Sequence, residues 1–237
     1  MGPRRPGRAH AFVADLDQPE LEDVDRHHLE RVLRVRPGEM ITVSDGEGGW
    51  RLCRLGPSLE PVAEVVRDAR PGPEITVAFA PVKGDRPEWA VQKLTELGVD
   101  RIVAFAAARS VVRWEGDKAT KAVERLRRVA REAAMQSRRT RLPEVEACTT
   151  FAEVAARPGA VIAHPDGNPP WLARGPVLVG PEGGWAPEEE DTPLPRMALG
   201  PHVLRSETAT VAAATLLGAL RAGAVVAAPD HGGDPAA

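Results

Sequence analysis

The chain has 237 residues, 43% of them hydrophobic, and a formal net charge of -3 at pH 7. This length suits one large domain or two smaller ones. The charge excludes an overall polycation, so any nucleic-acid contact must come from a local basic patch. The two cysteines and six histidines form no cluster with metal-ligand spacing, so we expect no metal site. Without an apolar run that could span a bilayer or a signal-peptide core, we expect a cytoplasmic protein with no membrane partner.

The first seventy residues have the pattern of a small β-rich domain. Short apolar runs bounded by turn residues predict strands at 11–14, 41–44, 50–55 and 62–66. A helix is predicted over 25–35, with Leu29, Val32 and Leu33 on one side. Several short strands joined by tight turns favour a small β-barrel, which we place at 1–70.

From residue 74 the pattern changes to strands that alternate with helices. Continuous apolar runs predict strands at 75–82, 101–107, 160–163, 177–179 and 197–199. Helices are predicted at 86–97, from 117 to about 136, and from 206 to about 220. This alternation indicates an α/β domain with a parallel sheet, which we place at 74–228. The tail at 229–237 is rich in Asp, Gly, Pro and Ala, and we expect it to be disordered.

Two segments near the C-terminus have the same sequence pattern. Residues 177–185 and 197–209 each begin as an apolar strand and then break at a Gly-Pro step. The second leads into an Ala/Leu/Val helix, for which Ser206 is the predicted N-cap. Two strand ends of this kind predict a single pocket at the carboxyl edge of the sheet. Neither segment is a P-loop or a GxGxxG dinucleotide motif.

The motif Gly180-Pro181-Glu182-Gly183-Gly184 and the segment 199–209 resemble the two hallmark motifs of the RsmE family. Those proteins are 16S ribosomal RNA uridine-N3 methyltransferases of the SPOUT superfamily. Residues 25–34, 83–86, 92–99 and 130–139 resemble further motifs of the same family. The resemblance implies a C-terminal trefoil-knot domain that binds S-adenosylmethionine, an N-terminal PUA-like barrel that holds RNA, and a homodimer. His202 stands where the family more usually has Arg or Lys.

The resemblance also implies roles for individual residues. The cofactor would be bound by Val179, Gly180, Pro181, Glu182, Gly183, Gly184, Leu199, Gly200, Pro201, Val203, Leu204, Thr208 and Ala209. For the methyl transfer itself, Arg205, directly before the last helix, is our candidate for the cation that stabilises the negative charge on the uracil ring. Glu207 is our candidate for the group that accepts the N3 proton or positions the base. For Glu207 a structural alternative stays open, in which Ser206, Glu207 and Thr208 only brace the start of the helix.

A basic segment runs from Arg109 to Arg141, with eleven Lys or Arg against four Asp or Glu, a net charge of +7. It suits either an RNA backbone or a solvated helix face. With the resemblance, the RNA candidates are Arg31, Arg34, Lys83, Arg86, Gln136, Arg138 and Arg139. The predicted partner is 16S ribosomal RNA or the assembled small subunit. The alternatives are a methyltransferase acting on another RNA, such as tRNA, and a non-catalytic ribosome assembly factor.

Two local patterns give further predictions. The run Glu188-Glu189-Glu190-Asp191 follows Pro187 and predicts the solvated start of a helix, where negative charge suits the helix dipole. Lys93 and Glu96 stand three residues apart on a predicted helix and are expected to pair with each other.

Overall fold

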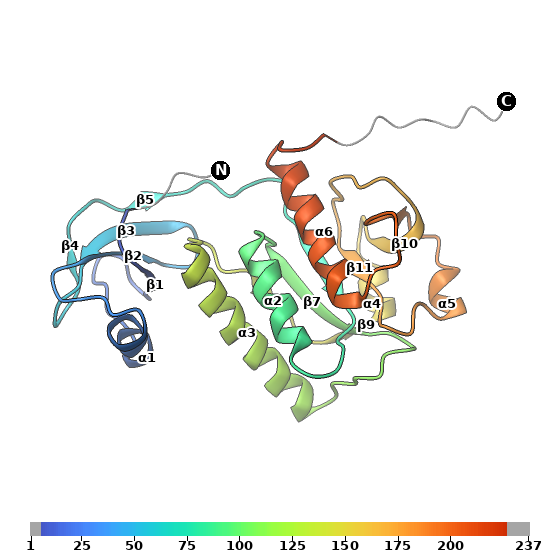
Figure 1. The fold of residues 1–237 in the computed structure, drawn as a ribbon, viewed down its shortest axis with the longest axis horizontal. Coiled ribbons are helices and arrows are strands. Elements are labelled where there is room, and N and C mark those ends of the chain that lie inside the picture. Colours follow the sequence, from blue (N-terminus) through green and yellow to red (C-terminus); the bar gives the residue numbers. More distant parts are fainter. Residues whose placement is uncertain (1–5, 227–237) are drawn as a thin grey trace. The chain divides into compact units, whose positions relative to one another are not determined.

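The computed structural model describes residues 6–226, which fold into two compact units (Figure 1). The first unit contains the chain up to Pro71 together with Arg128–Pro143, and the second contains Gly72–Arg127 and the chain from Glu144 onward. The segment Arg128–Pro143, which we had placed in the second domain, therefore packs within the first unit. The predicted disordered tail lies outside the described residues. Within residues 6–226, no helix is long and apolar enough to cross a membrane.

The first unit is built on a five-stranded sheet with the strand order β1-β2-β3-β4, in which β5 also pairs with β3. Its strands are β1 (His10–Phe12), β2 (Met40–Ser44), β3 (Gly49–Arg54), β4 (Glu60–Pro61) and β5 (Val66–Arg67). Strands β2 and β3 form an antiparallel hairpin. The Asp45 carboxylate closes its turn by accepting hydrogen bonds from the N–H groups of Glu47 and Gly49. The single strand predicted at 62–66 is wrong, because only its last residue is paired and a separate two-residue strand precedes it.

The helix predicted at 25–35 is present but irregular. It consists of an α-helix, α1 (Asp23–His27), followed directly by a π-helical turn, η1 (His28–Val32). The wider π-turn rotates the following side chains away from the face that Leu29 occupies. Leu29 is fully buried, whereas Val32 is 61% and Leu33 is 43% exposed. The prediction that these three residues share one side is therefore wrong.

The helix α3 (Asp117–Ser137) contributes its C-terminal part to the first unit. Ala134 and Met135 belong to the same hydrophobic core as Leu29 and Ile41. Arg131 donates to both carboxylate oxygens of Asp25, at 2.8 and 2.6 Å.

Asp25 is only 4% exposed, so its charge is compensated almost entirely by this bidentate contact. The Arg131 guanidinium also lies over the Phe12 ring, 5.6 Å from its centroid. The hydrogen bond to Asp25, which outweighs the effect of burial, raises the pKa of Arg131 above its ordinary value.

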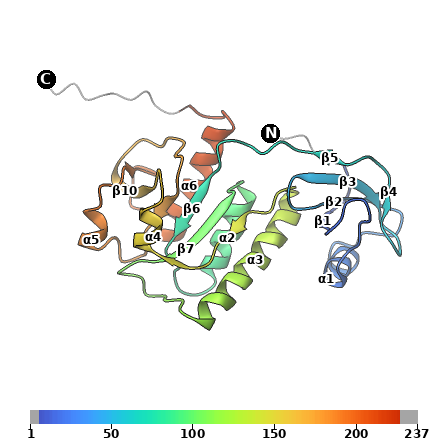
Figure 2. The ribbon, with the colours of Figure 1, turned by 180° about the vertical axis from the view of Figure 1, so that it is seen from behind.

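The second unit contains a parallel sheet with the order β12-β10-β11-β6-β7-β8, and β9 pairs with β7 (Figure 2). Its strands are β6 (Thr76–Phe79), β7 (Arg101–Ala106), β8 (Glu144–Val145), β9 (Thr149–Thr150), β10 (Val161–Asn168), β11 (Val177–Val179) and β12 (Arg196–Met197). Its remaining helices are α2 (Arg86–Glu96), α4 (Phe151–Ala155), α5 (Pro187–Glu190) and α6 (Ser206–Arg221). The predicted α/β class and parallel sheet are confirmed, while β8, β9 and α4 were not anticipated.

Helices cover both faces of this sheet. The helices α2 and α6 pack against each other, and α6 also contacts β6 and β11 (Figure 1). On the opposite face, Val154 of α4 shares a core with Ala78, Val103 and Leu178 of three adjacent strands. Burial on both faces explains why these strands are continuous apolar runs in the sequence.

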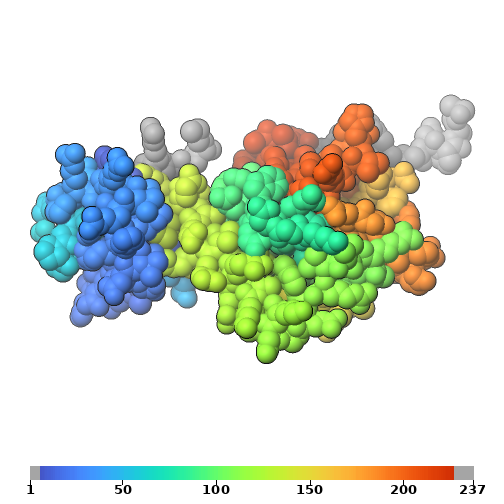
Figure 3. All heavy atoms as spheres, turned by 60° about the horizontal axis from the view of Figure 1, so that its bottom comes forward, coloured from blue at the N-terminus to red at the C-terminus, as the bar shows by residue number. Residues whose placement is uncertain are grey.

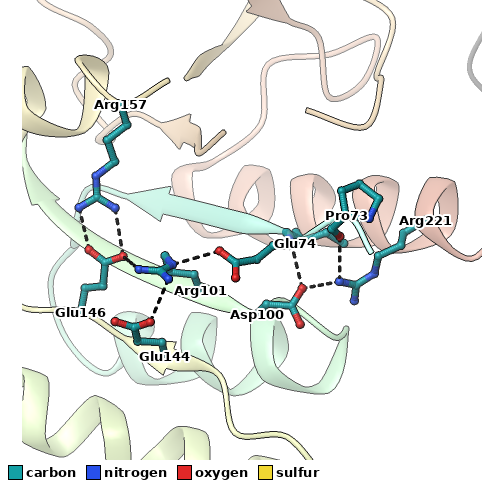
Figure 4. Close-up of polar contacts among 9 residues, drawn as sticks. Pro73, Glu74, Asp100, Arg101, Glu144, Glu146, Arg157 and Arg221 are labelled. Carbon is teal, nitrogen blue, oxygen red and sulfur yellow. Dashed lines mark hydrogen bonds and ion pairs between the residues drawn. The ribbon is translucent and has the colours of Figure 1, made fainter. Parts of the chain in front are cut away.

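Charged side chains gather where β7 and β8 begin (Figure 4). Arg101 lies between Glu74, Glu144 and Glu146, with nitrogen–oxygen distances of 3.0 to 3.2 Å. Arg157 pairs with the same Glu146 at 2.7 Å. Burial acts to raise the pKa of Glu146, but the hydrogen bonds from Arg157 and Arg101 outweigh it and hold the pKa below its ordinary value. This network therefore joins four separate segments at the amino edge of the sheet.

The last helix is attached at its C-terminal end. Arg221 pairs with Asp100 and donates to the carbonyl oxygen of Pro73 (Figure 4). It also donates to the carbonyl oxygen of Gly98. Gly98 follows the end of α2 with a φ of +89°, the left-handed conformation that glycine readily adopts at this position. Lys93 and Glu96 also pair as predicted, with a shortest distance of 2.8 Å.

Candidate functional site

A pocket opens at the carboxyl edge of the parallel sheet, where the sequence predicted one. Its volume is about 470 Å³, and it is formed by β10, by the segments that follow β11 and β12, and by the start of α6. Most of the predicted cofactor residues line it, namely Val179, Gly180, Pro181, Glu182, Gly184, Leu199, Gly200, Val203, Leu204 and Ala209. Gly183, Pro201 and Thr208 are not among the lining residues.

The loop after β11 curls back on itself because Gly180 has no side chain. A Cβ atom at this position would lie 2.9 Å from the Trp185 indole ring, closer than real contacts allow. Trp185 stacks on Phe105 and donates from Nε1 to the carbonyl oxygen of Ala163 at 3.1 Å. Gly184 adopts a φ of +70°, which side-chain-bearing residues rarely adopt. Trp185 thus shapes the pocket, and nothing in the sequence marked it beyond its place after the motif.

Ser206 does not cap the last helix, so that prediction is wrong. The N-cap is Arg205, which has an extended backbone, and no side chain caps this helix end. Ser206 is already the first helical residue, and its buried hydroxyl donates to the carbonyl oxygen of Gly180 at 2.7 Å. This hydrogen bond joins the two glycine-proline loops directly.

The two predicted catalytic residues lie differently with respect to the pocket. Arg205 is exposed and belongs to the lining. Glu207 does not line the pocket, and its Oε1 lies 3.7 Å from the guanidinium of Arg86. Arg86, a predicted RNA contact, also pairs with Glu182, so it lies between two carboxylates. The second oxygen of Glu207, Oε2, is buried without a hydrogen bond among the described residues.

His164 lines the pocket and was not predicted as a site residue, because it is isolated in the sequence. Its Nε2 lies 3.0 Å from Glu190 Oε1, and its Nδ1 accepts from the N–H of Asp166 at 3.1 Å. These contacts fix the ring in the pocket wall. His202 also lines the pocket and is exposed. Within residues 6–226, no group of three or more His, Cys, Asp or Glu side chains could hold a metal ion.

The acidic run at the start of α5 is not uniformly solvated as predicted. Glu189 is only 6% exposed. Its Oε2 accepts from the N–H of Ala186 at 3.0 Å, and its Oε1 accepts from the N–H of Ala108 at 2.7 Å. A carboxylate buried in this way must be hydrogen-bonded, and here two backbone donors from different loops satisfy it. The prediction of a helix start after Pro187 is confirmed, but that of a solvated Glu189 is wrong.

The RNA candidates are spread over both units. Lys83 follows β6 in the second unit, whereas Arg31, Arg34 and Gln136 lie in the first, and all four are exposed. Arg138 of the first unit donates to the carbonyl oxygen of Arg8 and has a φ of +58°. Several arginines of the basic segment are held in contacts within their own unit, namely Arg125 with Glu88, Arg127 with Val145, Arg131 with Asp25, and Arg141 with Glu47 and Asp68. Much of this segment is therefore structural.

The fold and the pocket define a class: an α/β protein with a ligand pocket at the carboxyl edge of its parallel sheet, joined to a smaller β-rich unit. Residues 70–218 match the family model of an RNA methyltransferase domain, and residues 21–57 match that of an RNA methyltransferase PUA domain. The chain belongs to the family of ribosomal RNA small subunit methyltransferase E.

Relatives and solved structures resemble it over most of their length. The ribosomal RNA small subunit methyltransferase E of Mycobacterium bovis is 34% identical, with 81% of this chain and 83% of that protein covered. The Bacillus subtilis protein of the same name is 32% identical, with coverages of 77% and 82%. The crystal structure of the Neisseria gonorrhoeae protein bound to S-adenosyl methionine is 29% identical. It covers 90% of this chain and 97% of its own, with a TM-score of 0.74.

Proposed function

We propose that this protein transfers the methyl group of S-adenosylmethionine to N3 of a uridine in 16S ribosomal RNA, acting in the cytoplasm. The observation that carries the proposal is the pocket itself. The two motifs that resemble the family's hallmarks, separate in sequence, form a single cavity and are joined by the hydrogen bond from Ser206 to Gly180. The substrate would be the free RNA or the assembled small subunit.

The pocket fits the cofactor in size and in chemistry. Its volume of about 470 Å³ falls within the range of small-molecule sites. Its lining includes three glycines, Gly180, Gly184 and Gly200, which have no side chains. A ligand can therefore approach the backbone N–H and C=O groups closely. These groups, with Leu199 and Leu204, would hold the adenine and ribose.

The proposed chemistry needs orientation and charge more than a reactive side chain. The sulfonium of the bound cofactor supplies an already activated methyl group. Uracil N3 carries a proton at neutral pH, and losing it places negative charge on the ring. Arg205, exposed in the pocket lining, is the proposed cation that stabilises this charge.

Glu207 is the proposed proton acceptor, with its structural alternative still open. Its buried Oε2 makes no hydrogen bond among the described residues, which supports a role as an acceptor. Its ion pair with Arg86 and its position outside the pocket lining support the alternative role of bracing the helix start.

Titration with S-adenosylmethionine by calorimetry tests the pocket. We expect the wild type to bind and Ala209→Leu to bind at least about tenfold more weakly, because the larger side chain would occupy the cavity. Ala209 lines the pocket on α6, where leucine is a good helix former. Thr215→Leu, an exposed position on the same helix, is the matched control and should bind as the wild type does.

The possible outcomes of this titration separate the functional alternatives. Equal binding by the Ala209→Leu variant would place the cofactor elsewhere. If the wild type failed to bind with RNA both absent and present, a non-catalytic assembly factor would be the better interpretation. A protein that binds the cofactor but methylates unmodified tRNA rather than unmodified small-subunit RNA would be a methyltransferase with another substrate.

We further propose a homodimer, as the family resemblance implies. Val203 supports it, because this apolar side chain lines the pocket yet is 87% exposed. Light scattering should give twice the chain mass of 25.4 kDa. A monomeric mass at micromolar concentration would exclude a stable dimer.

A further inference from the structure

The loop that follows β7 is attached to the outer side of the loop that follows β11. Arg109 donates from Nη1 to the carbonyl oxygen of Gly183 at 3.3 Å. A Cβ atom at Gly183 would lie 3.3 Å from the Arg109 Cβ, so the two backbones are in close contact. Gly183 stands between Glu182 and Gly184, both of which line the pocket. Arg109 is not a lining residue, so it contacts the pocket wall from outside.

Glu189 makes the second attachment between the same two loops. Its carboxylate accepts from the N–H of Ala108, directly before Arg109, and from the N–H of Ala186, directly after Trp185. Among the described residues no cation pairs with Glu189. A buried carboxylate is costly unless its hydrogen bonds are made, so this contact depends on both loops being in place.

Arg109 differs from the arginines of the basic segment that are held by carboxylates. Arg125 and Arg131 are paired with Glu88 and Asp25. Arg109 is exposed, and within residues 6–226 no carboxylate lies within 4.0 Å of it and its one hydrogen bond goes to Gly183. A guanidinium has five N–H donors, so most of its donor capacity faces solvent. Green segments of the second unit contribute to the surface in the space-filling view (Figure 3).

From this arrangement we propose that Arg109 binds a phosphate of the substrate RNA beside the pocket. Glu189 would be the positioning residue that holds Arg109 against the cofactor loop. The inference rests on the proposed function, since it names how the RNA strand is held at that site. RNA is favoured over the cofactor as the ligand because Arg109 lies outside the lining, where a molecule enclosed by the pocket does not reach. Arginine donors suit phosphate oxygens, which accept charge-assisted and often bidentate hydrogen bonds.

The first test is the Arg109→Ala variant, assayed with unmodified small-subunit ribosomal RNA as the probe. We expect its KM for RNA to rise about tenfold, with kcat and the dissociation constant for S-adenosylmethionine unchanged. The dependence of log Kobs for RNA on log salt should become shallower by about 0.7, because one phosphate of a single strand is no longer neutralised. Arg174→Ala is the matched control, because Arg174 is an exposed arginine before β11, at the opposite edge of the sheet.

The Glu189→Gln variant tests the positioning role. Glutamine keeps one acceptor oxygen and loses the other, so one loop is released. We expect a smaller rise in KM for RNA. The double variant with Arg109→Ala should bind RNA no more weakly than Arg109→Ala alone, because Glu189 acts through Arg109. A merely structural role would instead give additive losses.

The outcomes separate this inference from the proposed function. If the wild type methylates RNA but Arg109→Ala leaves both KM and the salt slope unchanged, the inference is wrong and the function stands. A change in cofactor affinity with an unchanged salt slope would assign Arg109 to the cofactor instead. If the wild type neither binds the cofactor nor methylates RNA, the proposed function itself fails.

Discussion

Arg205→Ala should reduce kcat for methylation by about 100- to 1000-fold, the usual effect of removing a group that stabilises developing charge. Arg205 lies in the pocket lining and is the N-cap residue of α6, so its backbone is fixed while its side chain is exposed. Its side chain makes no capping hydrogen bond, so truncation leaves the helix start intact. The affinity for S-adenosylmethionine should therefore change little.

Single-turnover kinetics with saturating RNA, together with cofactor titration, would measure both effects. Arg205→Lys is the informative companion, since it keeps the charge but loses the planar donor geometry, and we expect intermediate activity. Unchanged turnover by the alanine variant would remove Arg205 from the mechanism. A parallel loss of cofactor binding would instead make it a binding residue.

The second large effect concerns the ion pair between Arg131 and Asp25. Arg131→Ala should lower the free energy of unfolding of the first unit by about 3 kcal/mol, because it leaves a buried carboxylate without its partner. Asp25→Ala should cost less, about 1–2 kcal/mol. The Arg131 side chain is 27% exposed and can turn toward water, whereas that of Asp25 is only 5% exposed.

Hydrogen exchange of the amides in β2 and β3 would report opening of this unit, with β6 and β7 as the internal reference. Arg128→Ala is the control, because Arg128 is exposed on the same helix, and its effect should stay within about 0.5 kcal/mol. If Asp25→Ala destabilised the unit more than Arg131→Ala, burial of the carboxylate would not be the dominant cost.

Much of the fold could be predicted because most helices and strands show the regular spacing of apolar residues that is typical of their type. The apolar run at 177–179 and the helix from 206 were placed correctly, since both are fully determined by local pattern. The π-turn at His28–Val32 could not be predicted, because a hydrogen bond that spans one residue more than in an α-helix leaves no trace in composition. The prediction of a strand at 62–66 is wrong for a different reason. Its three valines favour a strand, but only Val66 pairs with β3 as part of a strand in the folded structure.

The glycines of the site could be predicted from the sequence, whereas the positions of its charged side chains were harder to predict. Position 180 must be a glycine, because a Cβ atom there would lie too close to the Trp185 ring. This glycine belongs to the motif that identified the site in the sequence. Whether a residue near the start of α6 lines the pocket depends on the face of the helix that it occupies. Arg205 and Ala209, four residues apart, lie on the face toward the pocket. Glu207 and Thr208 do not line it. Glu189 was misjudged because an acidic run does not reveal which member meets the backbone of a distant loop.

The division of α3 between two compact units has a consequence for synthesis. Ala134 and Met135 complete the core of a unit whose other members lie before Pro71. The ribosome must therefore add Gly72–Arg127, a stretch of 56 residues from 127 - 72 + 1, before it makes the segment that closes this core. At about 5–20 residues per second this takes roughly 3–11 s. During that interval the core of the first unit lacks Ala134 and Met135, so this N-terminal unit reaches its complete packing only after part of the second unit has been made.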